Sequence, residues 1–249
     1  MKLLLKKMSK SELIKCMENS GYIKKNPLRT EDTGKMLEMA ICMVYDIPYQ
    51  GKYKYDLVLP EALKPRLMRL THLFPQCRHT AEKGARYDYT CLSDDSLHLS
   101  AKSTKGKNGK VAPQVIGQAS LKKFCEIMEI EFESVPKLKE YIQTHITDVL
   151  DVMVKYTFDC ANLYYNQEND TIKYITLDSP IHWQAYTFSW TRNQDEWKNS
   201  TTLKINNGLK EFSLVEFQIH TKLRKNLAIR WFYDSFLEIF KNNLTVINL

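Results

Sequence analysis

Residues 87–103 read YDYTCLSDDSLHLSAKS, and this stretch decides how the surrounding chain is interpreted. Apolar and polar side chains alternate over residues 87–92 and again over residues 97–103. A period of two is typical of a β-strand with one face against a core. The SDDS segment between the two runs has the composition of a turn. The stretch therefore predicts a β-hairpin.

The alternation assigns each side chain of the hairpin to one of two faces. The face expected against the core carries Tyr87, Tyr89, Cys91, Leu97, Leu99 and Ala101. The opposite face carries Asp88, Ser100 and Lys102. If the turn has an odd number of residues, opposed residues have numbers with an even sum, and Asp88 lies opposite Ser100 or Lys102. We therefore expect these three side chains within reach of one another.

This set of side chains suits the hydrolysis of a phosphodiester. A phosphodiester is anionic, so its hydrolysis is helped by a divalent cation that neutralises charge and lowers the pKa of an attacking water. Asp88 offers the carboxylate oxygen that a hard cation prefers, and the backbone carbonyl of Ala101 is a second candidate ligand. Lys102 would orient or deprotonate the water, or stabilise the developing charge. The alternative is an ordinary hairpin with one face in solvent.

A helix is predicted upstream of the hairpin. Apolar residues recur at helical spacing between Gly34 and Asp46, Thr33 is placed to cap the start, and Pro48 ends the helix. Glu38 lies on this helix, where it is either a residue of the site or a side chain that faces solvent.

A basic loop is predicted downstream, over residues 103–110 (STKGKNGK). Its lysines, Lys105, Lys107 and Lys110, would release counterions on contact with a DNA backbone. A solvated linker would have the same composition. The formal net charge of +7 also fits a polyanionic partner without requiring one.

The spacing of Asp88 and Ser100-Ala101-Lys102, with eleven residues between them, resembles a known nuclease signature. It is similar to the Asp…(Asp/Glu)-Xaa-Lys pattern of the restriction-endonuclease-like, or PD-(D/E)XK, superfamily and of its type II restriction endonucleases. That superfamily places the Asp and the Xaa-Lys pair on adjacent strands after a helix, which often carries a metal-binding Glu. The resemblance covers roughly residues 33–130. It implies a catalytic set of Asp88, Ser100, Lys102 and Glu38.

The resemblance also implies that Mg²⁺ is the cofactor, held by Asp88 and Glu38. Ser100 departs from the signature because the family usually has an acid there. The missing acid would come from elsewhere, and the candidates are Glu38, Glu126 and, as a weaker ligand, Gln118.

The resemblance implies a sequence-specific endonuclease acting on double-stranded DNA. Whether the chain acts as a monomer or a homodimer is left open, and a cognate DNA methyltransferase is implied by the function. Two alternatives are a non-catalytic DNA-binding regulator and a structure-specific repair or recombination nuclease. The chain carries no P-loop, H-E-x-x-H or G-x-S-x-G motif that would indicate other chemistry.

The last third of the chain is rich in predicted strands, after a long helix expected over residues 136–165. Glu216, Gln218 and His220 share one strand face, and Gln and Glu side chains are able to read adenine and cytosine. Arg224 follows and would grip phosphate or guanine. The alternative is the exposed side of an amphipathic strand.

Together these features predict an α+β fold. Residues 1–167 would form a catalytic core with a central mixed sheet flanked by helices, and residues 168–249 a β-rich DNA-recognition region. The six cysteines form no C-x-x-C pair, and the apolar run at the start is too short for a membrane span. We therefore expect a soluble cytoplasmic protein with no membrane partner.

Overall fold

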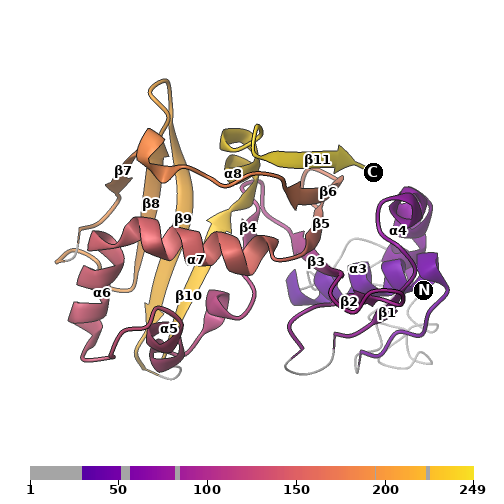
Figure 1. The fold of residues 1–249 in the computed structure, drawn as a ribbon, viewed down its shortest axis with the longest axis horizontal. Helices are drawn as coiled ribbons and strands as arrows, with labels where there is room; N and C mark the ends of the chain where they lie inside the picture. Colours follow the sequence, from indigo (N-terminus) through magenta and orange to yellow (C-terminus); the bar gives the residue numbers. More distant parts are fainter. Residues whose placement is uncertain (1–29, 52–56, 82–84, 194, 223–224) are drawn as a thin grey trace, which may run out of the picture.

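Two β-sheets, each with its own covering helices, organise the chain (Figure 1). The structure is a computed structural model, and it describes residues 30–51, 57–81, 85–193, 195–222 and 225–249. The two sheets and their helices confirm the mixed α and β fold class. No helix within the described ranges is long and apolar enough to cross a membrane.

The first sheet contains the predicted hairpin. Its strands, in spatial order, are β1 (Cys77–His79), β2 (Tyr89–Cys91), β3 (His98–Thr104), β5 (Ala161–Asn166), β6 (Thr171–Leu177) and β11 (Leu244–Asn248). Strands β3 and β5 run parallel, whereas the other neighbours are antiparallel, so the sheet is mixed as expected. Helices α3 (Thr30–Tyr45) and α4 (Val58–Leu67) and the 3₁₀ turn η1 (Met68–His72) share a buried core with this sheet.

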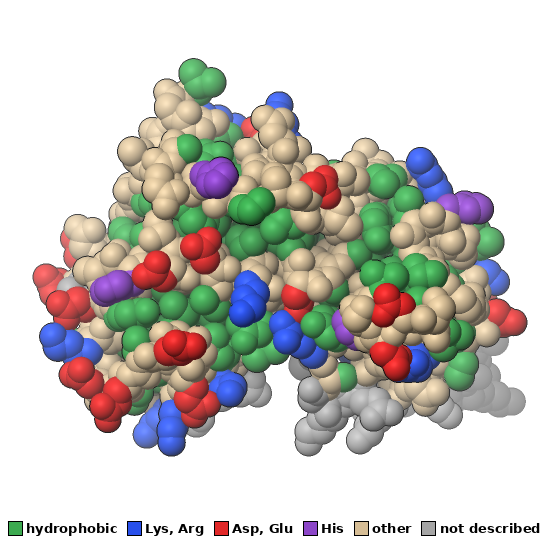
Figure 2. Space-filling view, viewed as in Figure 1, with side chains coloured by type: hydrophobic (Ala, Val, Ile, Leu, Met, Phe, Trp, Pro, Cys, Tyr) green, Lys and Arg blue, Asp and Glu red, His purple; other side chains and the backbone are tan. Residues whose placement is uncertain are grey.

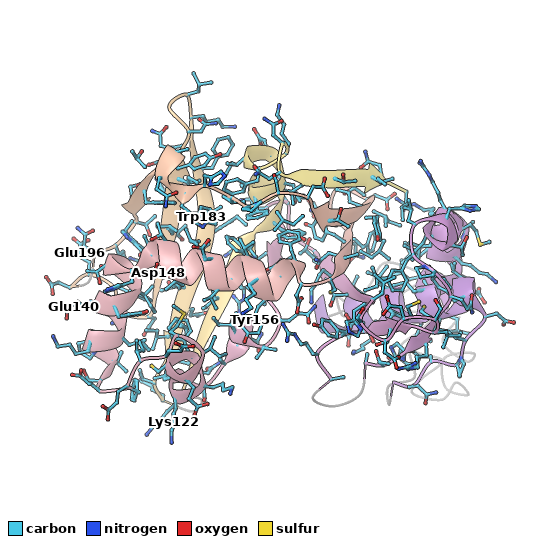
Figure 3. All side chains as sticks on the ribbon, in the orientation of Figure 1. Lys122, Glu140, Asp148, Tyr156, Trp183 and Glu196 are labelled. Atoms are coloured by element: carbon cyan, nitrogen blue, oxygen red, sulfur yellow. The ribbon has the colours of Figure 1, made fainter. Side chains whose placement is uncertain are left out.

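The second sheet is antiparallel throughout. Its strands, in spatial order, are β4 (Lys110–Val111), β10 (Asn226–Phe232), β9 (Glu211–His220), β8 (Ser200–Asn206) and β7 (Thr187–Trp190). The helical elements nearby are η2 (Ile116–Gln118), α5 (Leu121–Ile127), α6 (Val135–Thr144), α7 (Ile146–Phe158), η3 (Trp183–Ala185) and α8 (Tyr233–Ile239). Helices α5, α6 and α7 form a layer in front of the strands, with Lys122, Glu140 and Asp148 on it (Figure 3).

The prediction of one long helix over residues 136–165 is wrong. Helix α6 ends at Thr144, His145 adopts a non-helical conformation (φ −113°, ψ 38°), and α7 continues only to Phe158. The remaining residues form β5, which lies between β3 and β6 and is buried on both faces. A strand that is buried on both faces has no alternating pattern, so its apolar residues extend a helical pattern equally well.

Other expected boundaries also shift. Helix α3 begins at Thr30, so Thr33 lies inside it and is buried instead of capping it. The β-rich last third also contains a helix, α8, which directly follows β10. Strands β6 and β11 join the first sheet and β4 joins the second, so the division expected near residue 168 does not separate the sheets.

Candidate active site and DNA cleft

The hairpin register brings Asp88 opposite Ser100. Tyr89 pairs with Leu99 and Thr90 pairs with His98, so the residue numbers of each pair add up to an even number. The turn at residues 92–96 has the odd length that this register requires, and Cys91 N donates to Leu97 O across 2.9 Å. The predicted hairpin and its register are therefore confirmed.

Burial of the hairpin differs from the expected division into a core face and a solvent face. Thr90 and Ser100 on the polar face are buried, at 6% and 1% exposure. Leu97, expected in the core, is 40% exposed; it follows the turn directly, before β3 begins. Tyr87 precedes β2 and stacks on His98 at 3.8 Å between ring centroids, so the alternation does not extend to it. The polar face is thus partly interior: Thr90 and Ser100 are buried, whereas Asp88, His98 and Lys102 are half-buried.

The Asp88 carboxylate is held by two hydrogen bonds. Its Oδ2 accepts from Ser100 Oγ at 3.0 Å and from the backbone N–H of Ala101 at 2.8 Å. Among the described residues, its Oδ1 accepts no hydrogen bond. Burial raises the pKa of this carboxyl, Lys102 opposes the rise with its positive charge, and the negative charge of Glu38 adds to it. A carboxylate in this setting would be stabilised by a bound cation.

Ser100 occupies the position of the usual acid and connects Asp88 to a residue that no sequence signal identified. Gln114 is buried, and its Nε2 donates to Ser100 Oγ at 2.7 Å. Ser100 in turn donates to Asp88, so the hydroxyl orients the carboxylate. The next residue, Val115, has a φ of 56°, a conformation that costs a β-branched residue about 1–3 kcal/mol. The chain is therefore strained where it places Gln114.

Glu38 comes from α3 and is 5% exposed, so it does not face solvent. Lys35 Nζ donates to both of its carboxylate oxygens, at 2.7 and 2.9 Å. His79 Nε2 lies 3.3 Å from Oε2. The backbone N–H of Gln50 donates to His79 Nδ1 at 3.0 Å, so the ring carries its proton on Nε2 and donates to Glu38. Lys35 and His79 escaped the sequence analysis because one turn of helix and a three-residue strand carry no distinctive pattern.

A cleft of about 700 Å³ brings these groups together between α3, β3, β4 and β10. Its charged lining consists of Lys35, Glu38, Lys102, Lys110 and Arg230. Among the described residues, the Lys102 ammonium forms no ion pair, so it is available to an anionic ligand. Figure 2 shows the surface hollowed between the two lobes, with Lys and Arg side chains beside the hollow. We call it the catalytic cleft because candidate catalytic residues line it; it has four cationic side chains against one carboxylate.

A second cleft of about 550 Å³ continues from the first along the second sheet. We call it the reading cleft; its lining is Gln118, Asn199, Gln218, Ile219, His220, Thr221, Lys222, Asn226, Ala228 and Arg230. Gln118 and Arg230 line both clefts, so the two adjoin at these residues. Of the predicted DNA-binding residues, Gln218 and His220 lie here and Lys110 lies in the catalytic cleft.

The other predicted residues lie elsewhere. Lys105 and Lys107 are on the loop between β3 and β4 and line neither cleft. Glu216 lines neither cleft and is held by Lys110 and Arg230. Glu126 is exposed on α5, where it pairs with Lys123 at 3.1 Å. Arg224 lies outside the described residues.

The side chains fit a divalent cation by donor type. Asp88 and Glu38 supply the hard oxygen ligands that Mg²⁺ prefers. Within the described ranges, no group of three or more His, Cys, Asp or Glu side chains is arranged to hold a metal. Among the described residues, the candidate protein ligands are the Glu38 carboxylate in the cleft, the Asp88 carboxylate beside it and backbone oxygens such as that of Ala101, which is compatible with a cation that keeps several of its waters.

The chain is similar to a type II restriction enzyme over most of its length. This relative is the Type II restriction enzyme CviAII of Paramecium bursaria Chlorella virus 1, with 41% identity over 222 residues. The match covers 88% of this chain and 63% of the relative, so the chain spans less than two thirds of the relative's length. A match this long includes residues of both sheets. No family model matches the chain, and no solved structure matches it significantly.

Proposed function

We propose that this chain is a metal-dependent endonuclease that cuts double-stranded DNA at specific sequences, as a type II restriction enzyme with a PD-(D/E)XK core. The observation that carries the proposal is a cationic cleft lined by Glu38, Ala101 and Lys102, beside the Asp88–Ser100 pair to which the Ala101 N–H is bonded. The similarity to a type II restriction enzyme over 88% of the chain supports the same function.

The residues at and beside the catalytic cleft have distinct roles in the proposed mechanism. A bound Mg²⁺ would supply a Lewis acid and lower the pKa of the attacking water. Asp88 and Glu38 are the carboxylates that would hold it. Ser100 and the Ala101 N–H orient Asp88, and Lys35 with His79 orients Glu38. This arrangement favours Glu38 over Glu126 as the acid that replaces the one missing at position 100.

Lys102 is the residue we assign to the scissile phosphate. Its ammonium is near enough to Asp88 to influence the carboxyl's pKa, yet it is not tied up in an ion pair with any described residue. It is therefore free to stabilise charge that develops on the phosphate or to orient the attacking water. Lys105 and Lys107 on the following loop would contact more distant phosphates.

Sequence selection is assigned to the reading cleft. Its amide side chains suit base edges, because an amide both donates and accepts, and Gln pairs bidentately with adenine. Gln218 and His220 are the readers proposed here. A restriction function also implies a methyltransferase that protects the host's own DNA, and a homodimer would cut both strands of a symmetric site.

The direct test is to incubate the purified protein with phage DNA and Mg²⁺. Discrete bands with a common sequence at the fragment ends are expected, together with loss of cleavage in EDTA. Binding without cleavage would indicate a DNA-binding regulator instead. Cutting of flaps or junctions without discrete bands would indicate a structure-specific nuclease.

Metal binding is tested separately from activity by thermal unfolding with and without Mg²⁺. A ligand that binds only the folded state raises Tm. The wild type is expected to gain stability from millimolar Mg²⁺, and Asp88→Ala is expected to lose that gain. Glu126→Ala, which removes an exposed carboxylate outside the cleft, is the matched control and is expected to behave as the wild type. An equal gain in all three proteins would contradict the assigned metal ligands.

A further inference from the structure

Glu216 is committed to two cations within the protein. Its Oε1 accepts from Lys110 Nζ at 2.8 Å, and its Oε2 accepts from Arg230 Nη1 at 3.2 Å. The Glu216 side chain is only 18% exposed. A carboxylate that already receives two charge-assisted hydrogen bonds has little capacity left for a cytosine amino group. Glu216 is therefore poorly suited to read a base itself.

Arg230 lies where the two clefts meet. It is directly opposite Glu216 in the pairing of β10 with β9, so the two side chains share one face of the sheet. It lines both the catalytic cleft and the reading cleft. Only Nη1 is used by Glu216; among the described residues, Nη2 and Nε make no hydrogen bond. A guanidinium held on one side keeps a pair of parallel donors on its other edge.

The surroundings of Arg230 favour a base edge over a phosphate. Ala228 lies two residues before Arg230, on the same face of β10. Its side chain is small, so the sheet surface is recessed between Arg230 and Asn226. The opposite strand presents Gln218 beside this recess. The reading cleft is thus lined by amides near Arg230 and has one lysine, Lys222, whereas the catalytic cleft has three.

We infer that Arg230 reads a guanine through paired donors to its O6 and N7 atoms, and that Glu216 is the positioning residue that holds it for this contact. Bidentate pairing of Arg with the guanine edge is the most common specific contact in the major groove. The inference deepens the proposed function and rests on its assignment of DNA as the ligand. Because Arg230 also borders the catalytic cleft, it would link recognition of one base pair to the position of the scissile bond.

The test uses a short duplex that contains the target sequence. That sequence comes from the ends of the wild-type fragments or, if the protein binds without cutting, from duplexes selected by binding. Absence of cleavage would thus overturn the endonuclease proposal and leave the Arg230 test intact. Affinity is measured at one salt concentration for this duplex, for a random duplex, and for duplexes with single guanines replaced by 7-deazaguanine, which lacks the N7 acceptor.

Arg230→Lys keeps the charge but loses the fork of donors. It is expected to lose about 10- to 100-fold in affinity for the target duplex, with little change on random DNA. Wild-type binding should weaken when one particular guanine is replaced by 7-deazaguanine, and the variant should be insensitive to that replacement. Arg66→Lys is the control, because Arg66 pairs with Asp170 at 2.6 Å on the surface and lines neither cleft.

Glu216→Gln tests the positioning role. It frees Lys110 and Arg230, so binding to random DNA should tighten while discrimination and sensitivity to 7-deazaguanine fall together. A residue needed only for folding would weaken both kinds of binding. Glu211→Gln is the matched control, since Glu211 pairs with Lys204 at 2.6 Å on the same sheet outside both clefts.

Three results would overturn the inference. One is equal loss on target and random DNA in Arg230→Lys, which would assign Arg230 to a phosphate. Another is a variant that remains as sensitive to 7-deazaguanine as the wild type. The third is a protein that binds no sequence selectively, or a target without a G·C pair.

Discussion

The hairpin β2–β3 and the ribbon β9–β10 are both antiparallel pairs with a row of polar side chains, but only the hairpin row includes fully buried members. Thr90 and Ser100 in the hairpin are buried. Gln218 and Arg230 in the ribbon are half-buried and line open clefts. The buried row is satisfied mainly by other protein groups, whereas the open row retains donors and acceptors for a ligand. We expect changes in the first to affect geometry and chemistry, and changes in the second to affect affinity and selection.

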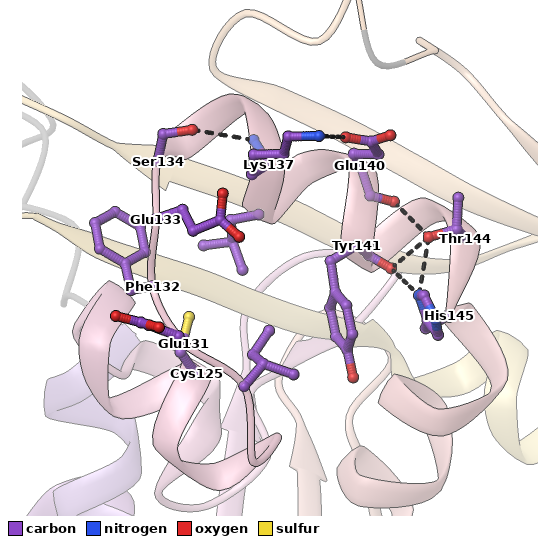
Figure 4. A pocket seen from close by; sticks show the side chains of 12 residues that line it. Cys125, Glu131, Phe132, Glu133, Ser134, Lys137, Glu140, Tyr141, Thr144 and His145 are labelled. Atoms are coloured by element: carbon purple, nitrogen blue, oxygen red, sulfur yellow. Dashed lines mark hydrogen bonds and ion pairs between the residues drawn. The ribbon is translucent and has the colours of Figure 1, made fainter.

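A third region, between α5 and α6, has a charge that is unsuited to DNA. The pocket of about 360 Å³ between α5 and α6 is lined by Glu131, Glu133 and Glu140 with one lysine, Lys137 (Figure 4). Lys137 is paired with Glu140 at 3.0 Å. The pocket is therefore acidic and would repel a phosphate backbone, in contrast to the four cations of the catalytic cleft.

The largest expected effect is on cleavage, from changes at the hairpin. Asp88→Ala and Lys102→Ala should each lower the cleavage rate by at least about 10²–10³-fold, because each removes a preorganised charge from beside the phosphate. Binding should persist, and removal of the Asp88 charge should tighten it in the absence of metal. Nicking of supercoiled plasmid and a gel shift on the same preparations measure both quantities. Cleavage at the wild-type rate in either variant would place the active site elsewhere.

The next effect is on binding, from the loop that leaves the hairpin. Replacing Lys105, Lys107 and Lys110 with Gln should reduce the dependence of binding on salt by up to about three units, one for each lost phosphate contact. The matched control replaces three exposed lysines of the helical layer, Lys122, Lys123 and Lys137. The same slope in both triple variants would show that the loop does not contact DNA.

A smaller effect is expected on stability, from the buried hydroxyl of the hairpin. Ser100→Ala leaves Gln114 Nε2 with only the weak acceptor Cys160 Sγ, at 3.5 Å, and removes one donor from Asp88, which should cost about 1–3 kcal/mol. Thr202→Ala is the corresponding change beside the ribbon, opposite Glu216, and should stay within about 0.5 kcal/mol. Urea unfolding monitors both. Equal costs would remove the proposed distinction between a buried and an open polar row.

The smallest effect concerns the pH dependence of stability. Burial raises the pKa of Asp88 in the folded protein. At pH values just above the ordinary pKa of the carboxyl, Asp88 is therefore more protonated in the folded protein than in the unfolded chain. Stability contributed by this group therefore falls as pH rises through that window, and Asp88→Asn should unfold at a higher Tm than the wild type at neutral pH. Each kcal/mol of difference in the free energy of unfolding would correspond to a difference in Tm of about 2–4 °C. The difference should shrink toward acidic pH in metal-free buffer; a constant or growing difference would contradict the raised pKa.

Local pattern by itself determined the hairpin. Alternation over 87–103 predicted the two strands and, if the turn had an odd length, a register with Asp88 opposite Ser100 or Lys102; the structure selects Ser100. The same alternation correctly separated Glu216, Gln218 and His220 from the buried face of β9. These features follow from neighbours only two residues apart along the strand, so the sequence contains them directly.

Contacts between distant segments decided the remainder. Thr90 and Ser100 on the polar face of the hairpin are buried, β5 is a strand beside β3, and Glu38 lies between Lys35 and His79. Glu216 has the same place in the alternating pattern as Gln218, yet only the pairing of β9 with β10 and the approach of β4 commit it to Arg230 and Lys110. Alternation predicts which face of a strand a residue lies on. The groups that contact that face come from other parts of the chain, so only the tertiary structure determines them.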